Sequence, residues 1–389
     1  MRILSIQIGV PFGDAATGLD LRNAALLKAL QEIGALSLLV LRREGLEAAP
    51  KWLDVHTLKG ESRRSIWNGR RHTRPLSYAF SAAEKQSLQE AIAALRPDVA
   101  IVEGVLLRDS MPLLKALGVP TVLDMHNIES DLLAETFRNR TWRFWPGNLL
   151  QEAIQKHTAK SEDKAAALAA DRLWLCSQNE VEDLGDRWGV AASVVPNPVH
   201  DDRLFDLPIT PERYSAANLV FVGHMRYGPN RKAIIALCKQ VRAALPAGAT
   251  LTFVGRNHTA QQEKMIAASR ALLVKSAPDI LPHMAEASYS IMPITYGGGT
   301  RIKVIEALAA GVLMIGTQKA VEGLGLVHGT HYLNGETPDA MVDLLNAALS
   351  NPAKTAEIAQ NGRAFVQQEF GPKAILAAAR SGIESLTDS

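Results

Sequence analysis

The stretch YSIMPITYGGGTRIKVIEALAAGVLMIGT, residues 289–317, contains a short apolar run, a glycine turn, an amphipathic run and a second apolar run. Its spacing predicts a strand over 288–294, a helix over 300–310 that stops near Gly311, and a strand over 312–317. A strand, a helix and a further strand form the repeating unit of a parallel, doubly wound sheet. The stretch therefore predicts an α/β fold.

The turn in this stretch has the composition of an anion site, since it consists of Gly297, Gly298 and Gly299. Without Cβ atoms the backbone can approach a ligand closely. A helix expected to begin at Thr300 offers free N–H groups and the positive end of its dipole. Arg301 and Lys303 place two cations where they oppose that dipole, and a bound phosphate would offset this cost. A glycine turn beside a solvated helix face is the alternative.

Glu306 follows one turn later and borders an apolar stripe of Ile302, Ile305 and Ala309. A carboxylate at that position can accept hydrogen bonds from two neighbouring hydroxyls, as in a ribose diol. Turn and glutamate together predict a nucleoside diphosphate as the ligand.

The same alternation extends along the rest of the chain. Strands are predicted over 3–9, 36–41, 98–102, 119–124, 173–177, 219–223 and 250–255, and helices over 19–33, 81–95, 109–117, 148–170 and 232–244. Residues 194–199 are expected to be a strand that runs into an ordered loop, and 200–217 a linker. These assignments predict an N-terminal domain over 1–203, a C-terminal domain over 204–372, and a final helix over 373–389 that returns to the first domain.

Composition excludes several classes of protein. A net charge of +2 with no basic domain gives no reason to expect nucleic acid as a partner. Cys176 and Cys238 stand far apart without metal-type spacing, which indicates a reduced, cytoplasmic protein. No apolar run reaches the length of a membrane span. The first residues are expected to form a buried strand rather than a signal peptide.

Several segments resemble glycosyltransferase family four, a retaining family of GT-B fold. Residues 297–311 are similar to its C-terminal donor motif, and Phe221–Asn230 is similar to its opening C-domain strand and loop. Further similar segments are Phe253-Val254-Gly255, Val195-Pro196-Asn197-Pro198 and Leu123–Glu129. The resemblance covers most of the chain and is strongest over 219–325.

The resemblance implies a GT-B α/β fold, with two Rossmann-like doubly wound domains that face an interdomain cleft. It implies a retaining glycosyltransferase that moves a sugar from a nucleotide-diphosphate sugar to a saccharide or lipid-linked acceptor, in polysaccharide or glycoconjugate biosynthesis. The N-terminal domain would bind the acceptor and the C-terminal domain the donor. One departure concerns the family's Glu-x7-Glu motif, because its first position is Gly298 here. The preference for a donor sugar is therefore left open.

The resemblance also assigns roles to residues. Implied catalytic residues are His126, Arg301 and Lys303. Implied donor-binding residues are Gly13, Gly18, Gly223, Arg226, Lys232 and Gly255, with Gly297–Thr300 and Glu306. Weaker acceptor candidates are Arg22, Glu103, Asn127 and Glu129. Arg231 is an alternative to Lys232, and Glu322 is a candidate to face the donor sugar. Solvated charges and ordinary turn contacts are the structural alternatives.

No metal and no cofactor beyond the nucleotide sugar is expected. The sequence contains no Asp-x-Asp, whereas enzymes that hold a sugar diphosphate through a divalent cation usually need paired carboxylates. Fixed cations and a helix dipole are expected to neutralise the leaving diphosphate instead.

Two stretches mix arginine with aromatic residues. They are Arg63, Arg64, Trp67, Arg70, Arg71 and Arg74, and Arg138, Arg140, Trp142, Arg143, Phe144 and Trp145. Such a mixture suits a lipid-diphosphate acceptor or peripheral contact with the inner face of an anionic membrane. Solvated loops whose aromatic rings pack on the domain are the alternative.

Two other functions are compatible with the same sequence. One is a sugar-nucleotide epimerase or hydrolase, which needs no acceptor. The other is a non-catalytic sugar-nucleotide-binding partner subunit that has lost the first motif glutamate.

Overall fold

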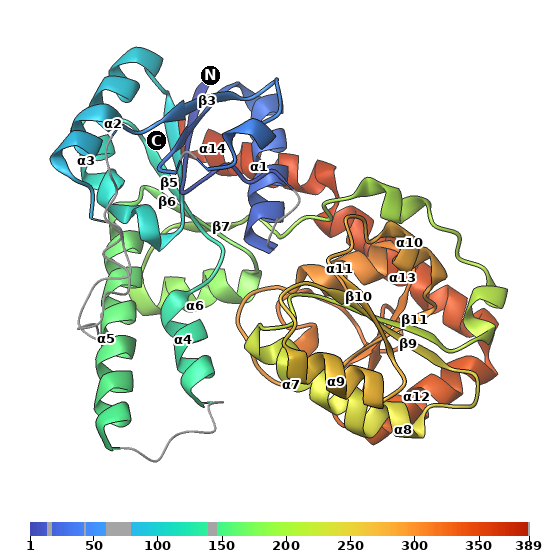
Figure 1. Cartoon of the computed structure of the whole chain (residues 1–389). Helices are drawn as coiled ribbons and strands as arrows, with labels where there is room; N and C mark the ends of the chain where they lie inside the picture. Colours follow the sequence, from blue (N-terminus) through green and yellow to red (C-terminus); the bar gives the residue numbers. More distant parts are fainter. Residues whose placement is uncertain (14–17, 43, 60–78, 139–145, 388–389) are drawn as a thin grey trace. The chain divides into compact units, whose positions relative to one another are not determined.

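The computed structural model describes residues 1–13, 18–42, 44–59, 79–138 and 146–387 (Figure 1). The chain divides into two compact units, Met1–Pro196 with Pro372–Ser389 and Asn197–Gly371. Of the two arginine and aromatic stretches, 60–78 and 139–145 lie outside the described residues.

The first unit is built on a parallel sheet. Among the described residues its strand order is β3-β2-β1-β4-β5-β6-β7, and every neighbouring pair is parallel. The strands are β1 (Arg2–Gln7), β2 (Ala35–Val40), β3 (Asp54–Thr57), β4 (Val99–Glu103), β5 (Thr121–Met125), β6 (Arg172–Leu175) and β7 (Ala192–Val194). Successive residues of β1 point to opposite faces. Ile3 therefore joins one hydrophobic core, while Leu4 and Ile6 join another.

Helices cover both faces of this sheet. They are α1 (Gly18–Ile33), α2 (Ala82–Leu95), α3 (Met111–Ala116), α4 (Glu129–Arg138), α5 (Pro146–Ala169), α6 (Gln178–Trp188) and α14 (Pro372–Thr387). The last helix of the chain packs beside α1 on the face that contains Ile3 (Figure 1). A Cβ on Gly382 of α14 would lie 2.4 Å from the indole nitrogen of buried Trp174, so glycine permits this close packing.

The second unit repeats the plan with a sheet of order β10-β9-β8-β11-β12-β13, all parallel within the described residues. Its strands are β8 (Asn218–Val222), β9 (Thr250–Gly255), β10 (Leu272–Lys275), β11 (Tyr289–Met292), β12 (Leu313–Gly316) and β13 (Leu333–Asn334). Its helices are α7 (Gly228–Ala236), α8 (Arg242–Ala244), α9 (Ala260–Ala268), α10 (Leu281–Glu286), α11 (Ile302–Ala309), α12 (Pro338–Ser350) and α13 (Pro352–Phe370). Two Rossmann-like parallel-sheet units thus confirm the predicted fold class.

Some predicted boundaries were wrong. The strand that was expected to run into an ordered loop over 194–199 begins at Ala192 and already ends at Val194, since Pro196 and Pro198 cannot donate to a ladder. Residues 200–217, which were predicted to be a linker, contain the 3-10 helices Asp202–Asp206 and Pro211–Ser215. The helix expected to begin at Thr300 begins at Ile302, with Arg301 as its N-cap.

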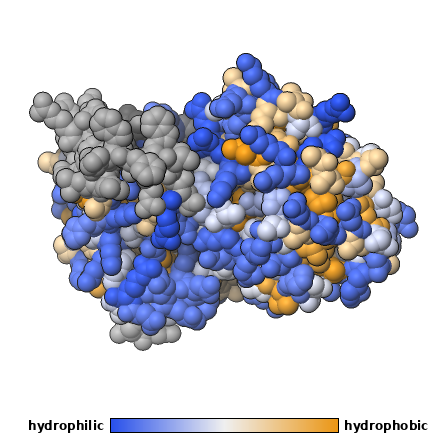
Figure 2. All heavy atoms as spheres, turned by 90° about the horizontal axis from the view of Figure 1, so that it is seen from below, coloured by the Kyte–Doolittle hydropathy of each residue, from blue (hydrophilic) through white to orange (hydrophobic). Residues whose placement is uncertain are grey.

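The surface in Figure 2 is mostly hydrophilic, with hydrophobic residues in separate small groups. The described exposed hydrophobic side chains of the second unit are likewise scattered: Tyr227, Ile235, Leu272 and Val327. Within the described part of the chain, no helix has both the length and the apolar character needed to cross a membrane.

Candidate functional site

The candidate donor site lies at the carboxyl edge of the second sheet, where β8 and β11 are neighbours. The chain runs outward from β8 to β9 and β10 and then returns to β11 on the other side of β8. Ligands of open parallel sheets bind at such a reversal of strand order. Gly223 follows β8, and the glycine turn follows β11.

The glycine turn needs glycine at two of its three positions. Gly297 has φ 117° and Gly299 has φ 68°, both in the region that side chains with a Cβ rarely adopt. A Cβ on Gly297 would also lie 2.9 Å from Cγ of Pro229. Gly298 has no positive φ, so its backbone conformation does not itself require glycine.

Helix α11 begins directly after this turn. Arg301 has the extended angles of an N-cap, and its side chain makes no capping hydrogen bond. The Arg301 guanidinium instead turns back and donates to the Gly297 carbonyl at 2.7 Å. Thr300 is buried, and the Asn197 amide donates to its hydroxyl at 2.7 Å and to its carbonyl at 3.1 Å. The first turn of α11 is thereby fixed at the carboxyl edge of the sheet.

Lys303 lies on α11, the helix that follows β11, and contacts residues of β8 and of α7. Its ammonium contacts the Asn230 side-chain oxygen and lies 4.8 Å from the ring centroid of Phe221 on β8. A Cβ on Gly223 would be 3.3 Å from the Lys303 nitrogen. Burial and, to a smaller extent, nearby Arg301 lower the pKa of Lys303 to about 7, while Glu306 opposes the shift. An anion beside this group would restore its charged form.

Glu306 is buried on α11 and forms an ion pair with Nδ1 of His200. His200 was not singled out by the sequence analysis. It comes directly after the segment Val195–Pro198, whose resemblance to a family motif was noted, but spacing alone does not show that a loop side chain reaches α11.

The other donor candidates lie on separate segments, and Arg226 and Lys232 are on the one that follows β8. Arg226 and Lys232 are exposed, and the Lys232 ammonium lies 5.8 Å from the ring centroid of Tyr296. Glu322 pairs with Lys319 at 2.6 Å. In the first unit, Gly13 and Gly18 flank residues 14–17, which lie outside the described residues.

Gly255 brings the ends of β8 and β9 together. A Cβ there would lie 1.9 Å from the Gly223 carbonyl oxygen and 2.7 Å from Cε of Met225. We therefore expect Gly255→Ala to lower the free energy of unfolding of the second unit by ~1–3 kcal/mol, the usual cost of overpacking. Thermal unfolding checks this. Gly185→Ala is the matched control, because a Cβ at Gly185 in α6 meets nothing within 4 Å. Equal melting temperatures for the two variants would contradict the prediction.

A polar layer lies at the carboxyl edge of the first sheet. Arg22 on α1 donates to Asp124 on β5 at 2.6 and 3.1 Å and to the Val195 carbonyl at 2.8 Å. The neighbouring Asn23 donates to Glu103 on β4 at 2.8 Å. Arg22 is only 2% exposed, and the acceptor contact predicted for it stays a prediction.

His126 follows β5 and packs near the backbone of Gly104, where an added Cβ would lie 3.3 Å from its Cε1. Burial lowers the pKa of His126 to about 4, so the imidazole is neutral near pH 7. Its Nδ1 is buried and makes no hydrogen bond to the described residues. Asn127 is half-buried in the same loop. Glu129 begins α4, and burial with nearby Asp163 raises its pKa to about 7.

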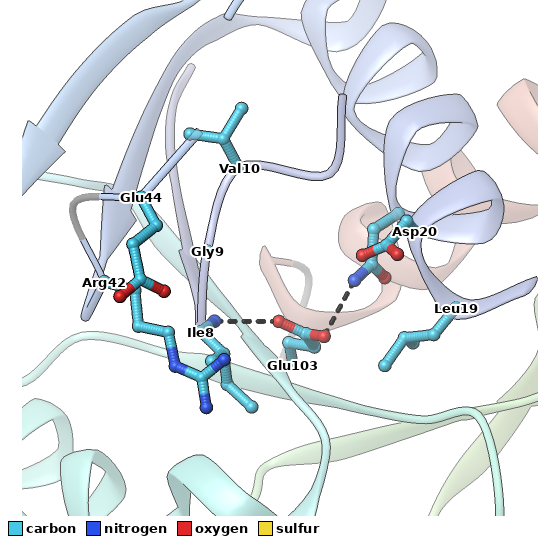
Figure 3. A pocket seen from close by; sticks show the side chains of 9 residues that line it. Ile8, Gly9, Val10, Leu19, Asp20, Arg42, Glu44 and Glu103 are labelled. Atoms are coloured by element: carbon cyan, nitrogen blue, oxygen red, sulfur yellow. Dashed lines mark hydrogen bonds between the residues drawn. The ribbon is translucent and has the colours of Figure 1, made fainter. Parts of the chain in front are cut away.

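Glu103 lies in a pocket of about 260 Å³ at this edge (Figure 3). Its carboxylate accepts from the Ile8 backbone at 2.9 Å and from Asn23, and burial raises its pKa to about 7. Figure 3 shows Arg42 and Glu44 on one side of the pocket and Asp20 of α1 on the other. The pocket lies where β1 and β4 are neighbours, which is the reversal point of this sheet.

Among the described residues, no group of three or more histidine, cysteine, aspartate or glutamate side chains has a geometry that would hold a metal ion. Cys176 and Cys238 are buried and form no disulfide with each other.

One comparison with known proteins concerns the second unit. Residues 216–351 match the family model described as "Glycosyl transferases group 1". A search of curated protein sequences finds no significant match.

Solved structures similar to the whole chain share its fold. Sucrose-phosphate synthase from Thermosynechococcus elongatus has a TM-score of 0.69 at 18% identity, with 100% of this chain and 99% of that chain covered. A glycosyltransferase from Rickettsia africae ESF-5 has a TM-score of 0.69 at 14% identity, with coverage of 100% and 98%. Alr3699/HepE from Anabaena, solved in complex with UDP, has a TM-score of 0.65 at 13% identity, with both chains fully covered. The matched domain and the shared fold identify the chain as a glycosyltransferase of the GT-B fold.

Proposed function

We propose that this glycosyltransferase transfers a sugar from a nucleoside-diphosphate sugar to a saccharide or lipid-linked acceptor, with retention of anomeric configuration and without a metal ion. The observation that carries the donor part is the convergence of the glycine turn, Arg301 and Lys303 at the reversal point of the second sheet. The diphosphate is proposed to lie there against the start of α11, and Glu306 to accept hydrogen bonds from the ribose.

Uridine is the first base to test. Alr3699/HepE has been solved with UDP and, in another structure, with UDP-glucose. At 13–14% identity these complexes show a shared fold. They nevertheless supply the nucleotide with which a binding screen should begin, followed by GDP, ADP and dTDP.

The chemical step is proposed to rely on fixed charge. Negative charge develops on the diphosphate as the bond to the sugar breaks, and preorganised donors in a partly buried site stabilise that charge. Lys303, Arg301 and the N–H groups of α11 are proposed to supply this stabilisation. The retaining outcome rests on the resemblance to family four.

The acceptor is proposed to bind at the carboxyl edge of the first sheet. The pocket around Glu103 offers carboxylates, an amide and a guanidinium, which are groups that hydrogen-bond sugar hydroxyls. A neutral His126 suits a hydrogen bond to a hydroxyl better than an ion pair with a phosphate.

An assay of donor turnover tests the proposal against its rivals. The protein is incubated with a panel of nucleotide sugars, with and without saccharide and lipid-linked acceptors, in the presence of a chelator. Released nucleoside diphosphate and the product anomer are then measured. Acceptor-dependent release and a retained anomer support the proposal. Release that never depends on an acceptor indicates a hydrolase, an isomerised nucleotide sugar indicates an epimerase, and binding without turnover indicates a partner subunit.

Arg301→Ala is expected to weaken UDP binding by at least ~1.5 kcal/mol, the scale of a hydrogen bond that involves a charged group. Isothermal titration calorimetry measures the loss. Lys354→Ala is a suitable control, because it removes a cation that pairs with Glu357 on the exposed face of α13. If the two variants bind UDP with equal affinity, Arg301 does not contact the diphosphate.

A further inference from the structure

The loop before the first 3-10 helix of the second unit contacts α11 and the residues directly before it at two points. Asn197, at its start, holds Thr300 through the amide. His200, at its end, contacts Oε1 of Glu306 through Nδ1. Glu306 is 4% exposed, so this contact occurs inside the fold rather than at the surface.

The backbone on either side of His200 is fixed. The amide of buried Val199 donates to the Phe370 carbonyl at 3.0 Å. On the other side the Asp201 carboxylate accepts from the Arg203 amide at 3.0 Å and so caps the 3-10 helix Asp202–Asp206. The imidazole is therefore presented to α11 from an anchored loop, and little conformational entropy is lost when the pair forms.

The contact determines where the histidine carries a proton. A carboxylate oxygen can only accept, so Nδ1 is the atom of His200 that carries the hydrogen when the two groups pair. His200 thus contacts Glu306 through Oε1, and Oε2 stays on the same carboxylate as an acceptor for a ligand.

We propose that His200 is a positioning residue for ribose recognition, acting through Glu306 without contacting the reacting atoms. This inference rests on the proposed function, because it takes the nucleoside ribose as the partner of Glu306. It predicts that the selectivity between a ribose and a 2′-deoxyribose depends on a histidine outside the glycosyltransferase motif.

The test compares UDP, GDP and ADP with their 2′-deoxy counterparts, by calorimetry on the full chain. We expect His200→Ala to weaken binding of the preferred ribonucleotide about tenfold, or about 1.4 kcal/mol. Affinity for the 2′-deoxy nucleotide should change little. The ratio of ribonucleotide affinity to 2′-deoxynucleotide affinity should therefore fall toward one. His200→Asn should keep most of the preference, since its amide nitrogen can donate from near the position of Nδ1.

Two controls separate positioning from folding. His56→Ala removes another histidine–carboxylate pair, with Asp54 at 2.8 Å in the first unit, and should leave the preference unchanged. In a Glu306→Gln background, His200→Ala should have no further effect on the preference, because paired residues are not additive.

The outcomes distinguish a failure of this inference from a failure of the proposed function. An equal loss of ribo- and 2′-deoxynucleotide affinity in His200→Ala, an unchanged preference, or tighter binding overturns the inference while the proposed donor site stands. Failure of the unsubstituted protein to bind any of the nucleotides overturns both.

Discussion

Replacing Asp124 by alanine should lower the free energy of unfolding of the first unit by ~3–5 kcal/mol, the cost of leaving one partner of a buried ion pair uncompensated. Both partners are inside the fold, because the side chains of Arg22 and Asp124 are each 2% exposed and their shortest contact is 2.6 Å. The remaining hydrogen bond from Arg22 to the Val195 carbonyl would not neutralise the guanidinium. Chemical denaturation followed by tryptophan fluorescence measures the effect, since Trp174 is buried in the same unit.

The exposed pair Arg2–Asp98 is the matched control. Its closest atoms are 2.8 Å apart, but the two side chains are 52% and 42% exposed. Asp98→Ala should therefore cost no more than ~1 kcal/mol. The double variant Arg22→Met with Asp124→Leu should recover most of the stability, because an apolar pair of similar volume leaves no buried charge. Equal losses for Asp124→Ala and Asp98→Ala would show that the buried pair is not a stability determinant.

Alternation along the chain was enough to predict the fold class. Runs such as Leu219–Gly223 and Thr250–Gly255 are short, apolar and separated by amphipathic segments, and each became a strand of a parallel sheet within a residue or two. The 3.6-residue and two-residue periods are local properties, so one sequence suffices to read them. Short, half-exposed elements were missed. The strand Asp54–Thr57 is exposed or half-buried throughout, and it therefore lacks the apolar run from which the other strands were predicted.

The site was predictable only where its residues are neighbours in sequence. Gly297, Arg301 and Glu306 share one strand–turn–helix unit, so their common location followed from the spacing. The partners of that unit come from elsewhere. Asn230 reaches Lys303 from α7, and His200 reaches Glu306 from a loop more than a hundred residues earlier. Such contacts depend on tertiary packing, which no periodicity encodes. Burial is also not visible in a motif, so the sequence did not predict the buried ion pair of Arg22 with Asp124.

Lys303 should make diphosphate binding strongly dependent on pH. Its pKa in the free protein is about 7, lowered first by burial and then by Arg301. A diphosphate beside the ammonium favours the charged form and raises that pKa. Between pH 7 and the new pKa, binding therefore takes up a proton. Affinity should fall as pH rises above about 7, by up to ~10-fold per pH unit, and should not depend on this group below pH 7.

The same group predicts how stability depends on pH. The pKa of Lys303 is lower in the folded protein than the ordinary value of 10.5, so above pH 7 the unfolded chain binds more protons than the folded one. The free energy of unfolding of the ligand-free second unit should therefore rise with pH between about 7 and 10.5. Lys303→Met should be more stable than the unsubstituted protein near pH 7 and yet bind UDP more weakly, because it removes the desolvated charge and the diphosphate contact together.

Calorimetric titration of UDP at pH 8 in buffers of different ionisation enthalpy measures the proton uptake. We expect uptake approaching one proton per UDP in the unsubstituted protein and almost none in Lys303→Arg, whose guanidinium stays charged throughout this range. Lys303→Ala should bind UDP at least ~100-fold more weakly at pH 7, the loss of about two hydrogen bonds that involve charged groups. Lys232→Ala, which removes an exposed lysine from α7 near the same edge, tests whether any nearby cation produces the effect. Proton uptake that persists in Lys303→Arg would assign the pH dependence to another group and remove Lys303 from the diphosphate site.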